Sequence, residues 1–528
     1  MRREDLLAPE VYNIADEIEK YAENENKKAL IVHHENGIIE EISYTNLIKK
    51  ANKVANVFRN NGLQKGDVIL VMVPRSVEAY VTYIGALKAG LTIIPSSEML
   101  RAKDIDYRIE HSNAKAIVAF ENELEQFEDV KLLGQLTLFV FGEAKQPWIS
   151  IRSQIEQASE VFNGIQTKES DIAFLSYTSG TTGNPKGVVH SHGWGYAHLR
   201  TTAPKWLGVE EGDIVWATAA PGWQKWIWSP FLAVLGSGAT AYVHLGRFDA
   251  ESYLQMLQNF KINVLCCTPT EYRLMAKVDN LASYDLSNLR SAVSAGEPLN
   301  SEVINQFKKV FSLQVRDGYG QTENTLLVGT LIDMEPRPGS MGKPTPGNVV
   351  EIINDLGEPT VTGEVGDIAV HSSTPALFKG YLNDPGRTEK QYRGEWYITG
   401  DRAFKDEEGY FWFEGRGDDI IVSSGYTIGP FEVEDALVKH EAVKECAVVA
   451  SPDEIRGNIV KAYVILRDPL LKTSPTIVKE LQEHVKTITA PYKYPRAIEF
   501  VDELPKTSSG KIRRIELRNR ELESNVVK

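Results

Sequence analysis

The chain has 528 residues, more than a single hydrophobic core organises, so we expect two or more domains. Its hydrophobic content of 42% and charged content of 25% are typical of a soluble globular protein. The net charge of −14 argues against nucleic acid as a partner, although a nucleotide ligand needs only a local cationic site.

Apolar runs alternate with helical patterns between residues 45 and 141. Thr45 is the predicted N-cap of a helix that continues to residue 58, and Ser76 is the predicted N-cap of a helix that ends at Gly90. Fully apolar runs, which suit covered parallel strands, occupy residues 68–73, 91–94, 116–120 and 138–141. This alternation predicts an α/β domain with a parallel sheet.

Residues 177–187 (Tyr-Thr-Ser-Gly-Thr-Thr-Gly-Asn-Pro-Lys-Gly) directly follow an apolar run at 172–176, which reads as a buried strand. Glycines allow backbone N–H groups to approach an anion, and hydroxyl groups add donors, so the segment is a candidate phosphate loop. A Ser/Gly surface turn is the alternative, and the density of hydroxyls, glycines and a Pro-Lys pair favours the phosphate loop. It is not the common G-x-x-x-x-G-K-[ST] loop, because Gly187 follows the lysine. The candidate phosphate-binding residues are Thr178, Ser179, Gly180, Thr181, Thr182 and Lys186.

Four tryptophans lie between residues 213 and 245, where charge is sparse: Trp216, Trp223, Trp226 and Trp228. Core packing is the expected role for most of them. Trp223 follows Pro221-Gly222 at a predicted turn between a strand and a helix, where an aromatic side chain can wall a ligand pocket. We therefore take Trp223 as the best candidate for the wall of a ligand pocket.

Three later strands, predicted at 263–268, 289–293 and 313–316, end in small and polar residues rather than in apolar turns. The carboxyl ends of parallel strands meet at one edge of the sheet, where ligands bind in such folds. A glycine beside Tyr319 offers a flat slot suited to adenine. Thr322 offers a hydroxyl and Glu323 a carboxylate oxygen, the ligand type that Mg²⁺ prefers near phosphates.

The composition changes near residue 340. Short β-like runs between 342 and 412 predict a small β-barrel or twisted sheet, and Asp401 within it follows a glycine, as turn residues do. The polar segment Arg416-Gly-Asp418-Asp is a candidate domain boundary, after which a small α+β domain of about 110 residues is expected. From 493 to 520 there are eight Lys/Arg against four Asp/Glu, which is typical of a solvated tail and also suits a ligand that carries several phosphate charges.

The three cysteines indicate the compartment. Cys266 and Cys267 are adjacent and Cys446 is distant, a pattern of neither a disulfide framework nor a metal motif, so we expect reduced thiols in a cytoplasmic protein. We find no apolar run of about 18 residues and no signal peptide, so we expect no transmembrane segment.

The order of these motifs resembles that of the adenylate-forming superfamily, which comprises acyl-CoA synthetases, peptide-synthetase adenylation domains and beetle luciferases. The resemblance spans roughly residues 20–520 and rests on the loop at 177–187, on Tyr319-Gly-Gln-Thr-Glu323, on Gly-Asp401, and on Pro-Lys-Thr-Ser-Ser-Gly-Lys511. Within the superfamily the segments at 294–300 and 317–323 look like those of short- and medium-chain acyl-CoA synthetases.

The resemblance implies a role for each motif. The loop closes over the β- and γ-phosphates of ATP, Thr322 contacts ATP, Glu323 binds Mg²⁺, and Lys511 is the catalytic lysine. Asp401 holds the ribose hydroxyls, Arg416 contacts ribose or phosphate, and Gly320 joins Trp223 at the acyl pocket. The remaining implied ATP- or AMP-binding residues are Gly296, Glu297, Pro298, Asp317, Gly318, Tyr319 and Gln321.

The resemblance also implies a mobile C-terminal domain. It gives an N-terminal adenylate-forming domain at 1–415, a hinge at 416–419 that pivots at Asp418, and a C-terminal domain at 420–528. Ser424 and Gly425 would line the channel for coenzyme A. Thr427 stands where many family members have an arginine, which weakens any inference about domain closure at that point.

The implied function is an ATP-dependent carboxylic acid:CoA ligase for a short- to medium-chain, branched or unbranched, fatty acid, with ATP, Mg²⁺ and coenzyme A as required molecules. An aromatic-acid ligase of the benzoate type and a ligase that loads an acyl carrier protein remain alternatives. A luciferase-like oxygenase and a nucleotide-binding protein without turnover are further alternatives; the carboxylates and Lys511 count against the last. The sequence leaves open which acid is used and whether the chain forms a homodimer.

Overall fold

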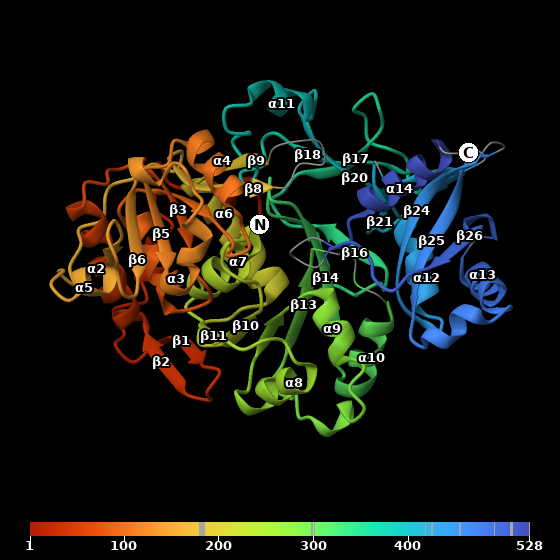
Figure 1. Ribbon diagram of the computed structural model, residues 1–528, viewed down its shortest axis with the longest axis horizontal. Coiled ribbons are helices and arrows are strands. Elements are labelled where there is room, and N and C mark those ends of the chain that lie inside the picture. The colour runs from red at the N-terminus through yellow and green to blue at the C-terminus, as the bar shows by residue number, and fades with distance from the viewer. Residues whose placement is uncertain are drawn as a thin grey trace.

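The computed structural model describes residues 1–178, 185–296, 299, 301–417, 419–423, 426–453, 456–489, 491–506 and 511–526. It is a mixed α/β structure with a large N-terminal part built on two sheets and a smaller C-terminal part, which lies at one end of the molecule (Figure 1). The predicted fold class is confirmed.

The first sheet has seven strands in the order β7-β6-β5-β3-β4-β8-β9. All neighbouring pairs are parallel except β8 and β9, which run antiparallel and flank the candidate phosphate loop. The strands are β3 Val68–Met72, β4 Thr92–Pro95, β5 Ala116–Phe120, β6 Thr137–Phe141, β7 Ile149–Ser150, β8 Ile172–Thr178 and β9 Lys186–Ser191. The apolar runs predicted as strands here are therefore strands.

Helices α2 (Tyr44–Asn60), α3 (Val77–Lys88) and α4 (Ala102–Ser112) accompany the first sheet. The Ser76 hydroxyl accepts a hydrogen bond from the Ala79 N–H at 3.4 Å, so the predicted cap of α3 is confirmed. The predicted cap of α2 is wrong. Ser43 caps that helix, accepting from Asn46 N–H at 3.2 Å, while Thr45 donates to the carbonyl of Ala22.

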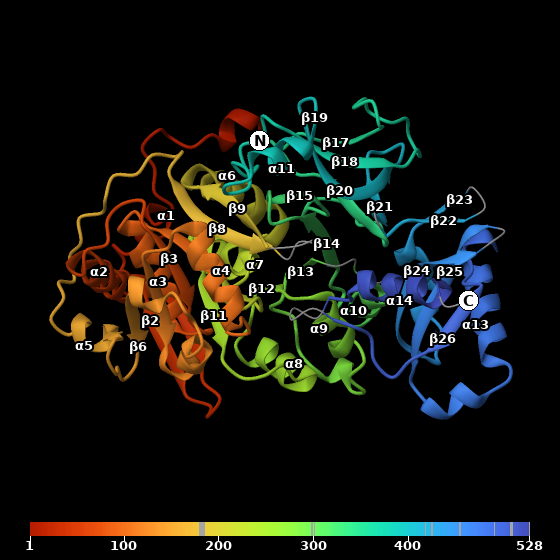
Figure 2. The ribbon, with the colours of Figure 1, turned by 45° about the horizontal axis from the view of Figure 1, so that its top comes forward.

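The second sheet has fourteen strands and runs through the centre of the molecule, as the tilted view in Figure 2 also shows. Its order is β17-β18-β20-β21-β16-β15-β14-β13-β12-β10-β11-β1-β2, and β19 pairs with β20. The parallel centre consists of β10 Ile214–Ala217, β11 Thr240–His244, β12 Val264–Cys266, β13 Ser291–Ala295 and β14 Val315–Gly320. Edge strands β1 (Lys28–His33) and β2 (Ile39–Ser43) complete that side, and helices α8 Ala250–Asn259, α9 Pro269–Met275 and α10 Ser301–Phe311 connect the centre.

The other side of this sheet is antiparallel. It consists of β15 Leu326–Gly329, β16 Ser340–Pro344, β17 Val350–Ile353, β18 Gly366–His371, β19 Tyr392–Arg393, β20 Trp396–Lys405 and β21 Phe411–Arg416. Of the two predicted forms for this region, a small β-barrel or a twisted sheet, the strand order gives a twisted sheet that continues the central one. β14 also extends to Gly320, so the segment predicted to follow that strand partly belongs to it.

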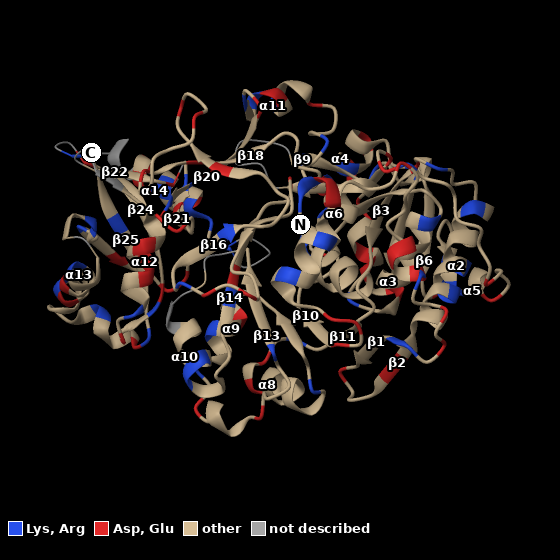
Figure 3. Cartoon of the chain, turned by 180° about the vertical axis from the view of Figure 1, so that it is seen from behind, with Lys and Arg blue, Asp and Glu red and all other residues tan. Residues whose placement is uncertain are grey.

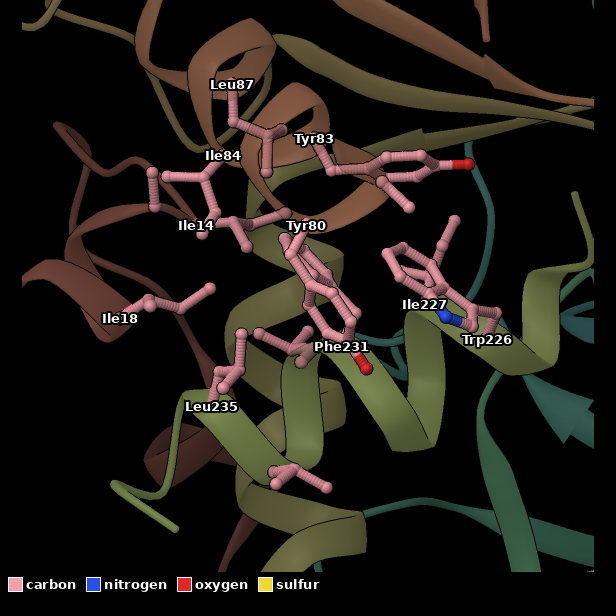
Figure 4. Close-up of a cluster of buried hydrophobic side chains, with 14 of the residues drawn as sticks. Ile14, Ile18, Tyr80, Tyr83, Ile84, Leu87, Trp226, Ile227, Phe231 and Leu235 are labelled. Atoms are coloured by element: carbon pink, nitrogen blue, oxygen red, sulfur yellow. The ribbon is translucent and has the colours of Figure 1, made fainter. Parts of the chain in front are cut away.

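Aromatic packing joins the two sheets. Helix α3 presents Tyr80 and Tyr83 to Trp226 and Phe231, which belong to the helical segment after β10 (Figure 4). The Tyr83 and Trp226 rings lie 4.6 Å apart edge to face, and Trp226 stacks on Phe231 at 5.3 Å. Trp216 is also buried, so the predicted core role holds for it and for Trp226.

The C-terminal part contains the hairpin of β22 (Ile421–Ser423) with β23 (Tyr426–Ile428) and a three-stranded sheet in the order β24-β25-β26. Its other elements are α12 Pro430–Val438, β24 Val443–Asp453, β25 Gly457–Leu466, α13 Ile477–Ile488, β26 Ala497–Phe500 and α14 Arg514–Val526. It has its own hydrophobic core, centred on α12, α13 and the sheet. Charged residues of both signs colour the outer helices while the strands are mostly uncharged, as expected for covered sheets (Figure 3).

Candidate active site

Lys186 and Glu323, which belong to two motifs 137 residues apart, meet beside Tyr381. The Lys186 ammonium lies 3.5 Å from Glu323 Oε1, and Tyr381 donates a hydrogen bond to the same oxygen at 2.9 Å. The ammonium also contacts the Tyr381 hydroxyl at 3.1 Å. Within the described part of the chain, Glu323 Oε2 accepts no hydrogen bond, so one carboxylate oxygen remains available to a ligand.

Thr178 lies opposite Lys186 in the register of β8 with β9, so the two ends of the candidate phosphate loop are adjacent. The Thr178 hydroxyl is buried and has no hydrogen-bond partner among the residues that the structure describes. The predicted loop residues between these ends, Ser179, Gly180, Thr181 and Thr182, lie outside the described residues.

Asp401 is the second buried carboxylate of the site, in β20. Its Oδ2 accepts hydrogen bonds from the Tyr319 hydroxyl and from Gln321 Nε2, both at 2.6 Å. Arg416, its neighbour across the strand pair, lies 3.9 Å from Oδ1. Burial raises the pKa of Asp401, while Arg416, Tyr319 and Gln321 oppose that rise because they stabilise the charged form.

Asp317, predicted to bind the nucleotide, directs its carboxylate to the backbone. It accepts from the N–H groups of Gly318 at 2.8 Å and Leu299 at 3.4 Å, and its own carbonyl accepts from Trp206. Burial raises its pKa to about 7, although the two backbone donors and nearby Lys225 lower it. The side chain thus fixes the segment at the end of β13. Glu297 and Pro298 of that segment, also predicted to bind the nucleotide, lie outside the described residues.

Lys511 reaches this same segment from the C-terminal part. A Cβ placed on Gly296 would lie 4.0 Å from the Lys511 ammonium nitrogen. The ammonium is also near enough to Asp401 to lower the pKa of that carboxyl. The lysine, the end of β13 and the Asp401 carboxylate, predicted separately from three motifs, therefore lie in one place.

The two residues predicted for the acyl pocket, Trp223 and Gly320, lie in the turn after β10 and at the end of β14. Trp223 is partly exposed and begins the short helix α7 (Gln224–Trp226). Gly222 packs directly on the backbone after β4, since a Cβ placed there would lie 2.6 Å from the Ser97 nitrogen. Gly320 also packs closely, against Trp228: a Cβ placed on Gly320 would lie 3.0 Å from the Trp228 ring. Trp228, expected in the core, thus lies against a residue predicted to line the acyl pocket.

The segments predicted as the hinge and as the coenzyme A loop are described only in part. Asp418, Ser424 and Gly425 lie outside the described residues. Asp419, next to the predicted pivot, forms an ion pair with Arg518 of α14. Arg514, on the same helix, forms a bidentate pair with buried Glu434 at 3.1 and 2.6 Å, so α14 is held firmly against α12.

Two family models match the chain: AMP-binding enzyme over residues 18–382 and AMP-binding enzyme C-terminal domain over residues 432–511. The chain belongs to the AMP-binding enzyme family. It is 62% identical to the uncharacterised acyl-CoA ligase YtcI of Bacillus subtilis (strain 168), over 99% of this chain and 98% of that protein. It is 40% identical to the mitochondrial acyl-coenzyme A synthetase ACSM3 of Rattus norvegicus, over 97% of this chain and 91% of that protein.

Among solved structures, the anthranilate CoA ligase AuaEII in complex with anthranoyl-AMP superimposes with a TM-score of 0.91 and 29% identity, covering all of both chains. The resemblance to the adenylate-forming superfamily is thereby confirmed, as is the enzyme class of acid–thiol ligase. Within the described residues of this family member, no helix is long and apolar enough to cross a membrane.

Several buried polar atoms around the site have no hydrogen-bond partner among the described residues. They include Thr178 Oγ1, Gln224 Nε2, Trp228 Nε1, Gln321 Oε1 and Asn324 Nδ2. Such atoms are rare in folded proteins, and these five fit a site where a ligand or ordered water completes the bonding.

The residues present fit a magnesium ion bound mainly through its nucleotide. The described part of the chain contains no cluster of three or more His, Cys, Asp or Glu side chains that could hold a metal. Mg²⁺ commonly uses one or two carboxylates together with substrate phosphates, and the open oxygen of Glu323 suits that arrangement.

The sequence reading missed Tyr381, which shares Glu323 Oε1 with Lys186. It lies in an irregular segment between β18 and β19, with no glycine-rich turn or charged pair to mark it. Gln224, which accepts a hydrogen bond from Ser176 of β8, was also missed. The signal that could have identified Gln224 was a polar side chain within an otherwise apolar, tryptophan-rich segment.

Proposed function

We propose that this ATP-dependent acid:CoA ligase converts short- to medium-chain aliphatic carboxylic acids into their CoA thioesters through an acyl-AMP intermediate. The observation that carries the mechanism is the position of Lys511, whose ammonium lies beside Gly296 and influences Asp401. A protein that only bound nucleotide would have no need for a cation brought there from the C-terminal part.

The reaction has two steps because a carboxylate is a poor electrophile. In the first, a carboxylate oxygen attacks the α-phosphorus of ATP, a P–O bond forms, and the bond to the β-phosphate breaks to release pyrophosphate. In the second, the sulfur of coenzyme A attacks the acyl carbon, the thiol proton is lost, and AMP leaves with the electron pair of the C–O bond.

In the first step Lys511 lies between the carboxylate and the α-phosphate and stabilises the charge that develops there. Lys186, Thr178 and the loop between them hold the departing pyrophosphate, and Asp401 accepts hydrogen bonds from the ribose hydroxyls. Glu323 would hold Mg²⁺, which supplies positive charge to the β- and γ-phosphates. Tyr381 keeps the Glu323 carboxylate in place.

For the second step we propose domains at 1–415 and 420–528 that rotate about a hinge at 416–419, with Asp418 as the pivot. Lys511 then leaves, and the loop at Ser424 and Gly425 lines the pantetheine channel. Thr427 removes the arginine that many family members use near this interface. A cytoplasmic location accords with three buried, unpaired cysteines.

We propose an aliphatic acid because Trp223, a bulky ring at the turn before α7, would bound a pocket of limited size together with Gly320. An aromatic acid is the second candidate, since the anthranilate CoA ligase AuaEII superimposes over the whole chain. One methylene in an apolar pocket changes binding by only about 1–3 kcal/mol, so activity on neighbouring chain lengths will overlap.

Pyrophosphate release, measured with and without coenzyme A, tests the proposal. The acids are acetate, propionate, isobutyrate, 2-methylbutyrate, hexanoate, octanoate and benzoate. We expect turnover that requires coenzyme A and a maximum among the aliphatic acids. A maximum on benzoate would select the aromatic alternative. Release that coenzyme A leaves unchanged for every acid would indicate a carrier protein as the acceptor.

A further inference from the structure

Three buried rings form a continuous column beside the Thr322–Glu323 motif. His190 belongs to β9, and Trp194 and His198 to helix α6 (His192–Thr202); their exposed fractions are 0%, 1% and 0%. The His190 and Trp194 ring centroids lie 4.6 Å apart, and Trp194 stacks on His198 at 5.0 Å with an interplanar angle of 13°. We call these three side chains the ring ladder.

Each ring of the ladder forms a hydrogen bond to the segment 322–325. His190 donates from Nε2 to the carbonyl of Thr322 at 2.6 Å, and Trp194 donates from Nε1 to the carbonyl of Asn324 at 2.9 Å. The His198 ring nitrogen Nδ1 contacts the Thr325 hydroxyl at 2.7 Å. The intervening carbonyl, that of Glu323, accepts from Phe378 N–H at 2.8 Å, so the backbone on both sides of Glu323 is fixed.

His190, the first residue of the ring ladder, lies on the same strand as Lys186. Residues i and i+4 of a strand lie on the same face, so Lys186 and His190 face the same neighbour. Lys186 contacts the Glu323 carboxylate while His190 holds the carbonyl of the preceding residue. One strand thus fixes both the side chain and the backbone of the predicted metal-binding motif.

The protonation of the ladder suits this role. Burial lowers the pKa of His190 to about 4 and that of His198 to about 3, so both rings are neutral near pH 7. A carbonyl oxygen only accepts, so His190 carries its proton on Nε2, and His198, which faces the Trp228 carbonyl from its own Nε2, does the same.

We propose that the ring ladder is the positioning device of the adenylation step, with His190 as its principal residue. It sets the Thr322–Glu323 peptide so that the hydroxyl and the carboxylate face the β- and γ-phosphates together with Lys186. The inference rests on the proposed function of Glu323. Because the ladder holds the segment 322–325, its loss should weaken binding of magnesium–ATP and leave the thioester step nearly unchanged.

The test compares His190→Phe with His190→Gln and His192→Phe. Phenylalanine keeps a ring but removes the donor, and glutamine places an N–H near the position of Nε2. His192 is the matched control: it is 1% exposed and two residues away, but its Nδ1 accepts from the Ile14 N–H at 3.1 Å, remote from the motif. Three quantities are measured: magnesium–ATP affinity by calorimetry, each half-reaction separately, and the melting temperature.

We expect His190→Phe to weaken magnesium–ATP binding and slow adenylation by about 10- to 100-fold, the usual effect of removing a group that orients a metal ligand. Thioester formation from supplied acyl-AMP should change by less than about twofold. His190→Gln should recover most of the loss, and His192→Phe should lower the melting temperature without a selective loss of adenylation. If His190→Phe does not fold, Trp194→Phe, which removes one donor and keeps the stack, is expected to show the same selective loss.

Equal loss of both half-reactions in His190→Phe, matched by His192→Phe, would reduce the ladder to ordinary core packing and overturn the proposal. Unchanged magnesium–ATP affinity in both His190→Phe and Trp194→Phe would overturn it as well. Failure of the proposed role of Glu323 looks different, because Glu323→Gln would then show the same magnesium requirement as the unmodified enzyme.

Discussion

The two buried carboxylates of the site are bonded in different ways. Glu323 meets a cation, Lys186, together with the Tyr381 hydroxyl, and both contact the same oxygen. Asp401 meets neutral donors, Tyr319 and Gln321, and its nearest described cation, Arg416, lies 3.9 Å away.

This difference matches the ligands proposed for each group. A carboxylate with one oxygen neutralised by a fixed cation and the other open suits a metal ion among phosphates, whose charge it must balance. A carboxylate oriented by neutral donors suits the vicinal hydroxyls of ribose, which bring no charge. Changes to Glu323 and its partners should therefore slow mainly the adenylation step, in which ATP is intact. Changes to Asp401 and its partners should slow both half-reactions.

The largest effect is expected at Lys511, whose ammonium lies beside Gly296 and near the Asp401 carboxylate. Lys511→Ala should abolish adenylation, a loss of at least about 10³-fold, because the variant lacks the charge that stabilises the transition state. It should still form thioester from supplied acyl-AMP. Rapid-quench assays of each half-reaction give the comparison, and equal loss in both would refute the assignment of Lys511 to the first step alone.

Glu323→Gln should slow adenylation by about 10²-fold and raise the magnesium concentration required, because an amide replaces the charged oxygen. Glutamine can still accept from Tyr381, so the local structure should remain. Thioester formation from acyl-AMP should remain near the unmodified rate. A magnesium titration identical to that of the unmodified enzyme would show that the open oxygen of Glu323 does not bind the metal.

Asp401→Asn should raise the KM for ATP by about 10- to 100-fold, the range for loss of hydrogen bonds to a charged group. Unlike Glu323→Gln, it should weaken both half-reactions, since acyl-AMP contains the same ribose. The measurement is KM for ATP and for acyl-AMP in parallel. An effect restricted to ATP would place Asp401 with the phosphate set instead.

A third carboxylate, Asp317, extends the comparison to stability. Its folded pKa of about 7 lies above its ordinary value, so the folded state binds the proton more tightly than the unfolded state between about pH 4 and pH 7. The free energy of unfolding therefore falls as pH rises through that window and levels off above it.

Asp317→Asn imitates the protonated form and should lose this dependence. Relative to the unmodified protein, the variant should gain about 2–3 kcal/mol in stability between pH 5 and pH 8, since one pKa unit corresponds to about 1.4 kcal/mol. Urea denaturation at the two pH values gives the difference. Parallel stability curves for the two proteins would show that Asp317 does not titrate in this range.

The smallest effects are expected for the two tyrosines that orient the carboxylates. Tyr381→Phe and Tyr319→Phe each remove one donor, worth about 1 kcal/mol or roughly fivefold in rate. Tyr381→Phe should act on adenylation alone, and Tyr319→Phe on both half-reactions. The same pair of half-reaction assays distinguishes them, and identical profiles would remove the distinction between the two carboxylates.

The sequence by itself determined the elements and the family. The apolar runs at 68–73 and 116–120 form strands, and Ser76 caps α3. Both features could be predicted because the spacing of apolar residues and the hydrogen bond of a helix cap depend on only a few neighbouring residues. The motif residues Lys186, Glu323 and Asp401 could be found because each follows a strand or a glycine turn with a fixed local pattern. Even at this level the cap of α2 was misplaced, since Ser43 and Thr45 are chemically alike and only the path of the chain selects between them.

Only the tertiary structure decided what these residues contact. Tyr381 is 195 residues from Lys186 and His190 is 132 from Thr322. Trp228, in the helical segment after β10, lies against Gly320 of β14. No periodicity or turn signal encodes such pairs, because they depend on how α6, β9 and β14 pack once all of them have formed. The side chains that position the site residues are therefore visible only in the fold. The side chains that identify the family, those of the motifs, were visible in the sequence.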